Sequence, residues 1–130
     1  FTSVLKKDTS LQIVKAALGK SGEKVLEDIT ARRLKAVGDG TGYVNAARAM
    51  LSLNKIPLTP ILKEIQCHIS IISGEKDIFC PRKAADIMLS NLTKCTFKEV
   101  TNSGHLLSVD QPETYAQAIQ SALKIGEKYG

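Results

Sequence analysis

The sequence has no tryptophan and only three phenylalanines and three tyrosines. Proteins that bind single-stranded nucleic acid stack aromatic rings on the bases, so this scarcity argues against that class of partner. Basic residues outnumber acidic ones by 18 to 13, but they are scattered along helix-like segments and form no compact patch in the sequence. No stretch approaches the roughly 18 consecutive apolar residues of a membrane-spanning helix. We therefore expect no nucleic-acid partner and no membrane span.

Cysteine is scarce as well, and its spacing disfavours two structural roles. The chain has three cysteines, Cys67, Cys80 and Cys95, with no C-x-x-C pair among them. A structural zinc site uses four ligands, usually in close pairs, and only His68 and His105 could add to the cysteines. An odd number of cysteines also indicates no disulfide framework. We expect no metal site, reduced thiols and a cytoplasmic protein.

The overall composition is that of a globular protein. Hydrophobic residues make up 43% and charged residues 24% of the 130 residues, which argues against disorder. This length corresponds to one domain or to a part of one. The chain opens Phe1-Thr2-Ser3, without an initiator methionine or a signal-peptide pattern, so we expect a piece of a longer protein.

Residues 1–55 predict a series of helices. Asp8–Ser10 are N-cap residues ahead of apolar positions at helical spacing. Ser21 offers a second cap before a helix that ends at Gly38. A third, Ala-rich helix follows from about Tyr43.

Three glycines at positions 38, 40 and 42 invite comparison with a phosphate-binding loop. That chemistry needs a strand before the loop and a helix after it, whereas a helix is predicted on both sides here. We interpret the glycines as a joint between helices. Two prolines then make residues 56–60 a linker.

The second half predicts alternating strands and helices. Cys67–Ser73 is a β-branched run typical of a buried strand, and Thr96–Thr101 alternates as a second strand. Pro81 begins a helix between them, and Pro112 begins the last one. The apolar face expected on that last helix comprises Tyr115, Ile119, Ala122 and Leu123. This β-α-β-α order predicts parallel strands, which belong at the edge of a larger sheet.

Asp77 and His105 each follow a predicted strand directly, where open α/β sheets bind their ligands. Neighbouring strands are about 4.8 Å apart, so the two loops can bring the carboxylate and the imidazole into hydrogen-bond range. Such an aspartate fixes the histidine tautomer and leaves Nε2 as a general base. Gly104 permits a tight backbone approach beside the histidine. Spacing alone leaves open a catalytic pair or a surface aspartate with a structural histidine.

Three motifs, taken in order, resemble the C-terminal third of an α/β-hydrolase. They are Gly74-x-x-Asp77, Gly104-His105 and Asp110-Gln111-Pro112-Glu113. The resemblance covers about residues 61–126. It implies that Asp77 is the acid and His105 the histidine of a catalytic triad. It also implies an α/β fold in which a parallel β-α-β-α unit follows helical cap segments.

The resemblance further implies a domain division and a function. Residues 1–55 correspond to a helical cap segment and residues 56–130 to the C-terminal portion of the hydrolase core. The full-length protein is expected to be a serine-type hydrolase that acts by acyl transfer on a small ester or related carbonyl substrate, without a cofactor. The family's Gly-x-Ser-x-Gly nucleophile motif is absent from the sequence, so we expect this chain alone to be inactive. Its expected partners are the small-molecule substrate, the missing N-terminal half of the domain and, through uncovered strand edges, further copies of itself.

Two alternatives stay open, a non-catalytic hydrolase-like ligand-binding protein and a standalone interaction module.

Two further residues are candidates for chemistry but are not interpreted as catalytic. Cys80 lies three residues after Asp77, without an evident oxyanion pocket. His68 lies in the first predicted strand, where a packed histidine is the better interpretation.

Overall fold

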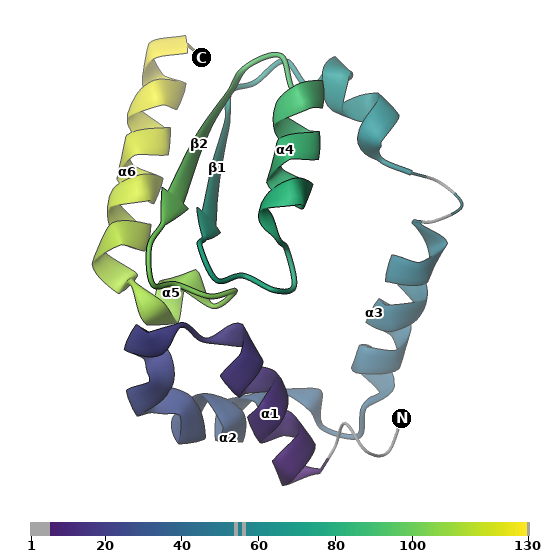
Figure 1. The fold of residues 1–130 in the computed structure, drawn as a ribbon. Helices are drawn as coiled ribbons and strands as arrows, with labels where there is room; N and C mark the ends of the chain where they lie inside the picture. Colours follow the sequence, from purple (N-terminus) through teal and green to yellow (C-terminus); the bar gives the residue numbers. More distant parts are fainter. Residues whose placement is uncertain (1–5, 54, 56, 130) are drawn as a thin grey trace.

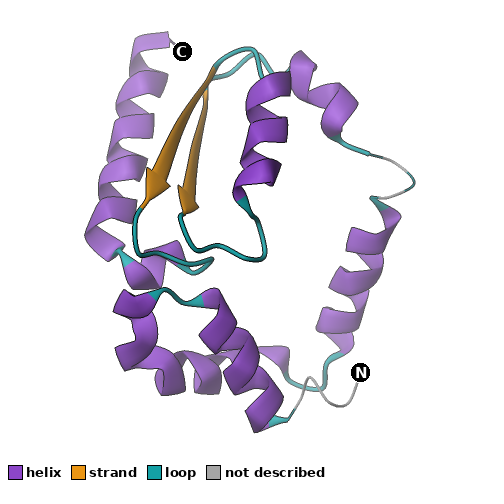
Figure 2. Ribbon diagram, in the orientation of Figure 1, coloured by secondary structure: helices purple, strands orange, loops and turns teal. Residues whose placement is uncertain are grey.

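The computed structural model describes residues 6–53, 55 and 57–129; Phe1–Ser3 and Ile56 lie outside the described residues. The elements in chain order are α1 (Lys7–Ala17), η2 (Lys20–Val25), α2 (Leu26–Val37), α3 (Thr41–Ser52), η3 (Thr59–Glu64), β1 (Ile69–Gly74), α4 (Arg82–Asn91), β2 (Cys95–Val100), α5 (Leu107–Asp110) and α6 (Pro112–Tyr129), where η marks a 3₁₀ helix. Figures 1 and 2 show helices arranged around two strands, with α3 lying apart from the sheet. No helix among the described residues is both long and apolar enough to cross a membrane.

The first helix starts earlier than the capping pattern predicts. Its N-cap is Lys6, so Asp8–Ser10 lie inside α1. The cause is tertiary packing, because Ser10 is fully buried and its Oγ accepts a hydrogen bond from Arg33 of α2 at 2.6 Å. Ser21 likewise lies inside η2 and does not cap α2. At Ser10, burial against α2 overrides the local preference of serine for a cap, whereas Ser21 is exposed.

The glycine joint connects α2 and α3, and two of its residues adopt conformations that favour glycine. Gly38 has a φ of 54° and Gly40 a φ of 86°. A helix lies on each side, so the strand that a phosphate-binding loop requires is not present there. The helix predicted from Tyr43 begins at Thr41, and none of its residues is buried. Its apolar side is uncovered in the described chain, with Met50 71% exposed.

The two strands are parallel, as predicted, in a register that pairs Ile69 with Cys95 and Gly74 with Val100. β2 begins and ends one residue earlier than predicted. The first strand, predicted over Cys67–Ser73, is confirmed with shifted bounds, Ile69–Gly74, but its predicted burial is wrong, because only Gly74 within it is buried. A parallel strand becomes buried when further strands and helices cover it on both sides. Among the described residues, each strand has one unpaired edge.

Helices α4 and α6 lie on opposite sides of the two strands in Figure 1. Pro81 is the N-cap of α4 and not its first residue. The last helix begins at Pro112 as predicted, but most of the apolar face expected on it is not covered by the described chain. The exposed members of that face are Tyr115, Ile119 and Leu123. The half-buried stripe instead comprises Thr114, Ala118, Ala122 and Ile125.

Three backbone segments meet closely at the carboxyl end of the sheet. A Cβ on Gly74 would overlap the carbonyl oxygens of Ser103 and Gly104. A Cβ on Gly104 would lie 2.5 Å from the carbonyl oxygen of Ala17. The end of β1, the loop after β2 and the end of α1 therefore pack backbone against backbone, which requires glycine.

We expect Gly74→Ala to destabilise the protein by about 1–3 kcal/mol, because its methyl group has no room between backbone atoms. Gly126 of α6 is the matched control, since a Cβ there meets no described atom outside its own helix within 4 Å. Gly126→Ala should stabilise by up to about 1 kcal/mol through helix propensity. Urea unfolding followed by circular dichroism measures both variants. Equal changes in the two would contradict the packing argument.

Candidate active site

The loops that follow the two strands are joined through their backbones. The amide of Glu75 donates to the carbonyl oxygen of Val100 at 2.9 Å, and the amide of Lys76 donates to that of Ser103 at 2.9 Å. These bonds continue the strand pairing into the loops. Asp77 and His105 consequently leave the sheet at the same edge.

Asp77 is held in place by three groups. Its Oδ1 accepts hydrogen bonds from the amides of Phe79 at 2.9 Å and Cys80 at 2.8 Å. Its Oδ2 lies 2.9 Å from Nδ1 of His105. The Asp77 side chain is 8% exposed and the imidazole 43%. Aspartate commonly forms such side-chain bonds to the backbone of a following turn, which explains why this residue type suits the position.

The protonation of the pair follows from the surroundings of Asp77. Burial acts to raise the pKa of Asp77, but the Cys80 amide, the His105 ring and the Phe79 amide hold that pKa below its ordinary value. The group is therefore a carboxylate near neutral pH and can only accept. The bond to His105 then requires a proton on Nδ1, so Nε2 of the neutral ring keeps its lone pair. This is the arrangement needed for a histidine that acts as a general base.

Two further contacts orient the histidine and its loop. The Phe79 ring centroid lies 5.4 Å from that of His105, with the planes tilted by 54°. Asn102 has a φ of 57°, and its amide donates to Oε2 of Glu75 at 2.9 Å. Asparagine adopts this left-handed conformation more readily than most residues. The chain can thus turn sharply between β2 and His105.

Asp110 supports the histidine loop in a way that the sequence analysis missed. The residue is 5% exposed, and its Oδ2 accepts hydrogen bonds from the amides of Gly19 and Gly104, each at 2.8 Å. Hydrogen bonds to a carboxylate are stronger than those between neutral groups. The carboxylate therefore joins the residue before His105 to the segment that follows α1.

The second oxygen of Asp110 has a different environment. Oδ1 is buried and has no hydrogen-bond partner among the described residues. A Cβ on Gly22 would overlap it, so the glycine there makes room for the carboxylate. In the sequence, Asp110 stands out as the first residue of the Asp110–Glu113 motif, but that position equally fits an ordinary helix start and indicates no buried carboxylate.

The other candidate residues lie in two different places. His68 directly precedes β1, at the end of the strand opposite to Asp77, and its Nε2 lies 3.3 Å from Oγ1 of Thr96. Cys80, in contrast, lies beside the pair, and the ligand atoms of Asp77, Cys80 and His105 all lie within 4.8 Å of one another. The absence of a catalytic role for His68 and Cys80 stays a prediction.

No protein-family model and no curated protein matches the sequence. Solved structures do match. A serine hydrolase involved in carbazole degradation, the CarC enzyme, has a TM-score of 0.77 and 18% identity over 93% of this chain. The esterase EaEST from Exiguobacterium antarcticum has a TM-score of 0.75 and 21% identity over 91% of it. A membrane phospholipase A, a bacterial virulence factor, has a TM-score of 0.69 and 20% identity over 93% of it.

The chain has the fold of the C-terminal part of an α/β-hydrolase. It spans 39–48% of the length of the three hydrolase structures. The α/β fold class and the resemblance drawn from the Gly74-x-x-Asp77, Gly104-His105 and Asp110–Glu113 motifs are confirmed at the level of fold. The division into residues 1–55 and 56–130 stays a prediction. The segment after α1 nevertheless contacts the histidine loop directly.

We expect Asp110→Ala to loosen the loop that carries His105. Two buried amides would lose their acceptor, at a cost of about 1–3 kcal/mol each. In native-state hydrogen exchange, the amides of Gly19 and Gly104 should exchange about 10- to 100-fold faster. Asp110→Asn retains a carbonyl oxygen and should have a smaller effect.

Asp86→Ala provides the control for this experiment. Asp86 is an exposed carboxylate that pairs with Arg82 within α4, so its removal should leave both glycine amides protected. Unchanged protection of Gly104 in Asp110→Ala would contradict the supporting role of the buried carboxylate.

Proposed function

We propose that this chain supplies the acid–base pair of a serine-type α/β-hydrolase that acts by acyl transfer on small esters or related carbonyl compounds. The observation that carries the proposal is the 2.9 Å contact between Nδ1 of His105 and Oδ2 of Asp77. It occurs at the carboxyl edge of two parallel strands, where open α/β sheets bind ligands. The nucleophile is assigned to a serine outside this sequence.

In the proposed reaction, Nε2 of His105 takes the proton of that serine hydroxyl as the oxygen attacks the substrate carbonyl carbon. Asp77 stays ionised and stabilises the imidazolium. The imidazolium then gives its proton to the leaving alcohol, and an acyl-enzyme forms. Water, deprotonated by His105, hydrolyses the acyl-enzyme and releases the acid. Side chains and water are sufficient for these steps, so the proposal includes no cofactor.

The structural neighbours support this reaction class. They are described as a serine hydrolase, an esterase and a phospholipase A, and the last two names denote hydrolysis of ester bonds. At 18–21% identity they share the fold with this chain, and they are about twice its length. An ester is therefore the substrate class that we carry over to the full-length protein.

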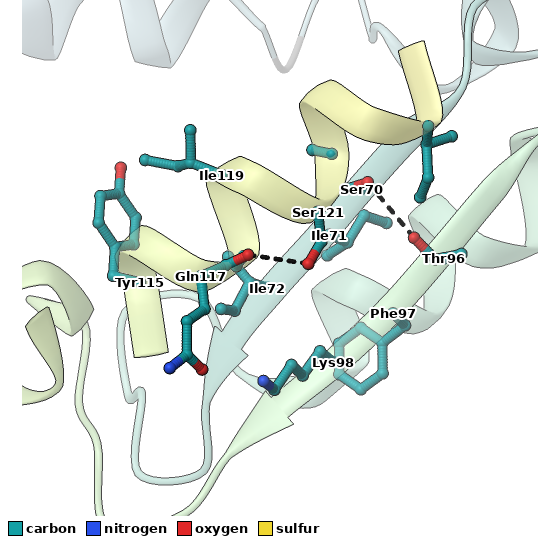
Figure 3. A pocket seen from close by; sticks show the side chains of 13 residues that line it. Ser70, Ile71, Ile72, Thr96, Phe97, Lys98, Tyr115, Gln117, Ile119 and Ser121 are labelled. Carbon is teal, nitrogen blue, oxygen red and sulfur yellow. Dashed lines mark hydrogen bonds between the residues drawn. The ribbon is translucent and has the colours of Figure 1, made fainter. Parts of the chain in front are cut away.

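The macromolecular partner that we propose is the remaining N-terminal half of the hydrolase domain. Each strand has one unpaired edge among the described residues. A groove of about 430 Å³ opens between the strands and α6 (Figure 3), and Ile72 and Ile119 line it from its two sides. Unpaired strand edges and uncovered apolar surface favour association. In the isolated chain the same surfaces favour self-association.

The cysteines support a cytoplasmic location as part of this proposal. Cys67, Cys80 and Cys95 are all free thiols in the structure. Free thiols persist in reducing compartments, where disulfides are rare. We place the full-length protein in the cytoplasm.

In the full-length protein, Asp77→Asn should lower kcat for p-nitrophenyl acetate by up to about 10⁴-fold, the effect of the equivalent change in another triad. The amide would hold the imidazole in the wrong tautomer. His105→Ala should be at least as damaging. His68→Ala is the control and should change stability more than rate. Undiminished turnover in His105→Ala would contradict catalysis and favour a ligand-binding protein instead.

The isolated 130-residue chain should show no serine-hydrolase activity, because neither a nucleophile motif nor its oxyanion hole is part of the sequence. A fluorophosphonate probe, which labels activated serines, should leave the chain unmodified by mass spectrometry. The full-length protein treated in parallel should be labelled once. Turnover by the isolated chain, with the label on one of its own serines, would overturn the assignment of the nucleophile.

A further inference from the structure

The loop after β1 brings a thiol to the acid–base pair. Cys80 follows Asp77 by three residues, and its amide donates to Oδ1 of Asp77 at 2.8 Å. Its sulfur and one ligand atom each from Asp77 and His105 all lie within 4.8 Å of one another. Among the described residues, this is the one group of three potential metal ligands at such distances.

These three donors form a set that suits zinc. Thiolate, imidazole and carboxylate are the ligands that zinc takes in proteins, at about 2.0–2.3 Å from the ion. Tetrahedral bonds of that length place neighbouring ligand atoms about 3.3–3.8 Å apart. Oδ2 of Asp77 and Nδ1 of His105, now 2.9 Å apart, must therefore separate by about 0.4 Å, and the sulfur of Cys80 must come within about 3.8 Å of both. Cys80 is exposed and the imidazole is 43% exposed, so both can rotate. Asp77 is fixed by the amides of Phe79 and Cys80 and provides a rigid third ligand.

We propose that Asp77, Cys80 and His105 form a zinc-binding site with three protein ligands and one open position. The sequence argued against zinc because a structural site needs four closely paired ligands. A three-ligand site is a different class, in which water takes the fourth position. Here the third ligand, His105, lies 25 residues beyond Cys80 in the sequence. The fold brings the three ligands together, and their spacing in the sequence does not indicate the site.

Zinc binding has a defined proton balance. The cysteine thiol loses its proton to solvent as the sulfur–zinc bond forms. Nδ1 of His105, which lies 2.9 Å from Asp77 Oδ2, binds the ion through its lone pair, and the imidazole proton moves to Nε2. In that state Nε2 no longer has a lone pair to accept a proton. Zinc is therefore an inhibitor of the hydrolase, a consequence that rests on the proposed function.

Cobalt(II) is the probe that tests the site without any measurement of activity. It replaces zinc in such sites, and a bound thiolate gives an intense charge-transfer absorption in the near ultraviolet. The wild-type protein titrated with cobalt(II) should develop this band, which excess zinc should remove. Cys80→Ser should abolish it. Asp77→Asn should weaken cobalt binding by about tenfold or more.

The chain supplies its own matched controls. Cys67 and Cys95, together with His68, line a separate groove. Cys67→Ser and Cys95→Ser should retain the full band. Circular dichroism checks that each variant is folded, and Cys80→Ala serves as a second variant. A band that persists in folded Cys80→Ser, or its absence from the wild type at millimolar cobalt(II), would overturn the proposal.

The proposed hydrolase function and the proposed zinc site can each be contradicted without affecting the other. Hydrolase assays are run with a chelator, so absence of zinc binding leaves them unaffected. Cobalt spectra require no substrate, so absence of turnover leaves them unaffected. Inhibition of the full-length enzyme by zinc, reversed by chelator and lost in Cys80→Ser, would support both.

Discussion

The buried carboxylate of Asp110, bonded to the amides of Gly19 and Gly104, is the interaction on which the site depends. It draws the segment after α1 against the loop after β2 at one point. The close approach is possible because glycines stand where the backbones meet, as at Gly74 and Gly104. The amide of Leu106 also donates to the carbonyl oxygen of Ala17 at 3.0 Å, so His105 lies between two anchored neighbours. The first helical segment therefore helps to position the imidazole, in addition to preceding it in the sequence.

The sequence predicted that Asp77 and His105 lie in hydrogen-bond range, because the determinants of this contact are local. A strand, a glycine turn and a charged residue each occupy a few consecutive positions, and parallel pairing brings the two loops to one edge. The hydrogen bonds of Asp110 could not be predicted, since one of its partners, Gly19, is 91 residues away and nothing near Gly19 in the sequence indicates a carboxylate. The same holds for Cys80. Its distance from Asp77 is local, but its approach to His105 depends on the pairing of β1 with β2.

The apolar residues of β1 and α6 that are less buried than their pattern suggests share one physical cause. Ile71 has the β-branched character of a core strand, and Tyr115 and Leu123 have helical spacing, yet Ile71 is half-buried and both Tyr115 and Leu123 are exposed. The spacing of apolar residues in a sequence indicates which surface is covered in the complete folded protein. This chain spans less than half of each hydrolase structure that it matches. The uncovered apolar residues are the surface that the proposed N-terminal half of the domain would cover.

The completeness of the acid–base pair contrasts with the incompleteness of the sheet around it. Among the described residues, Asp77 and His105 are oriented by the amides of Phe79 and Cys80 and by the ring of Phe79. A carboxylate held rigidly and an imidazole oriented against it suit proton transfer, and with a thiol beside them they offer the donor types that zinc takes. The two proposed chemistries use the same ring, so zinc bound at Nδ1 would exclude proton transfer at Nε2.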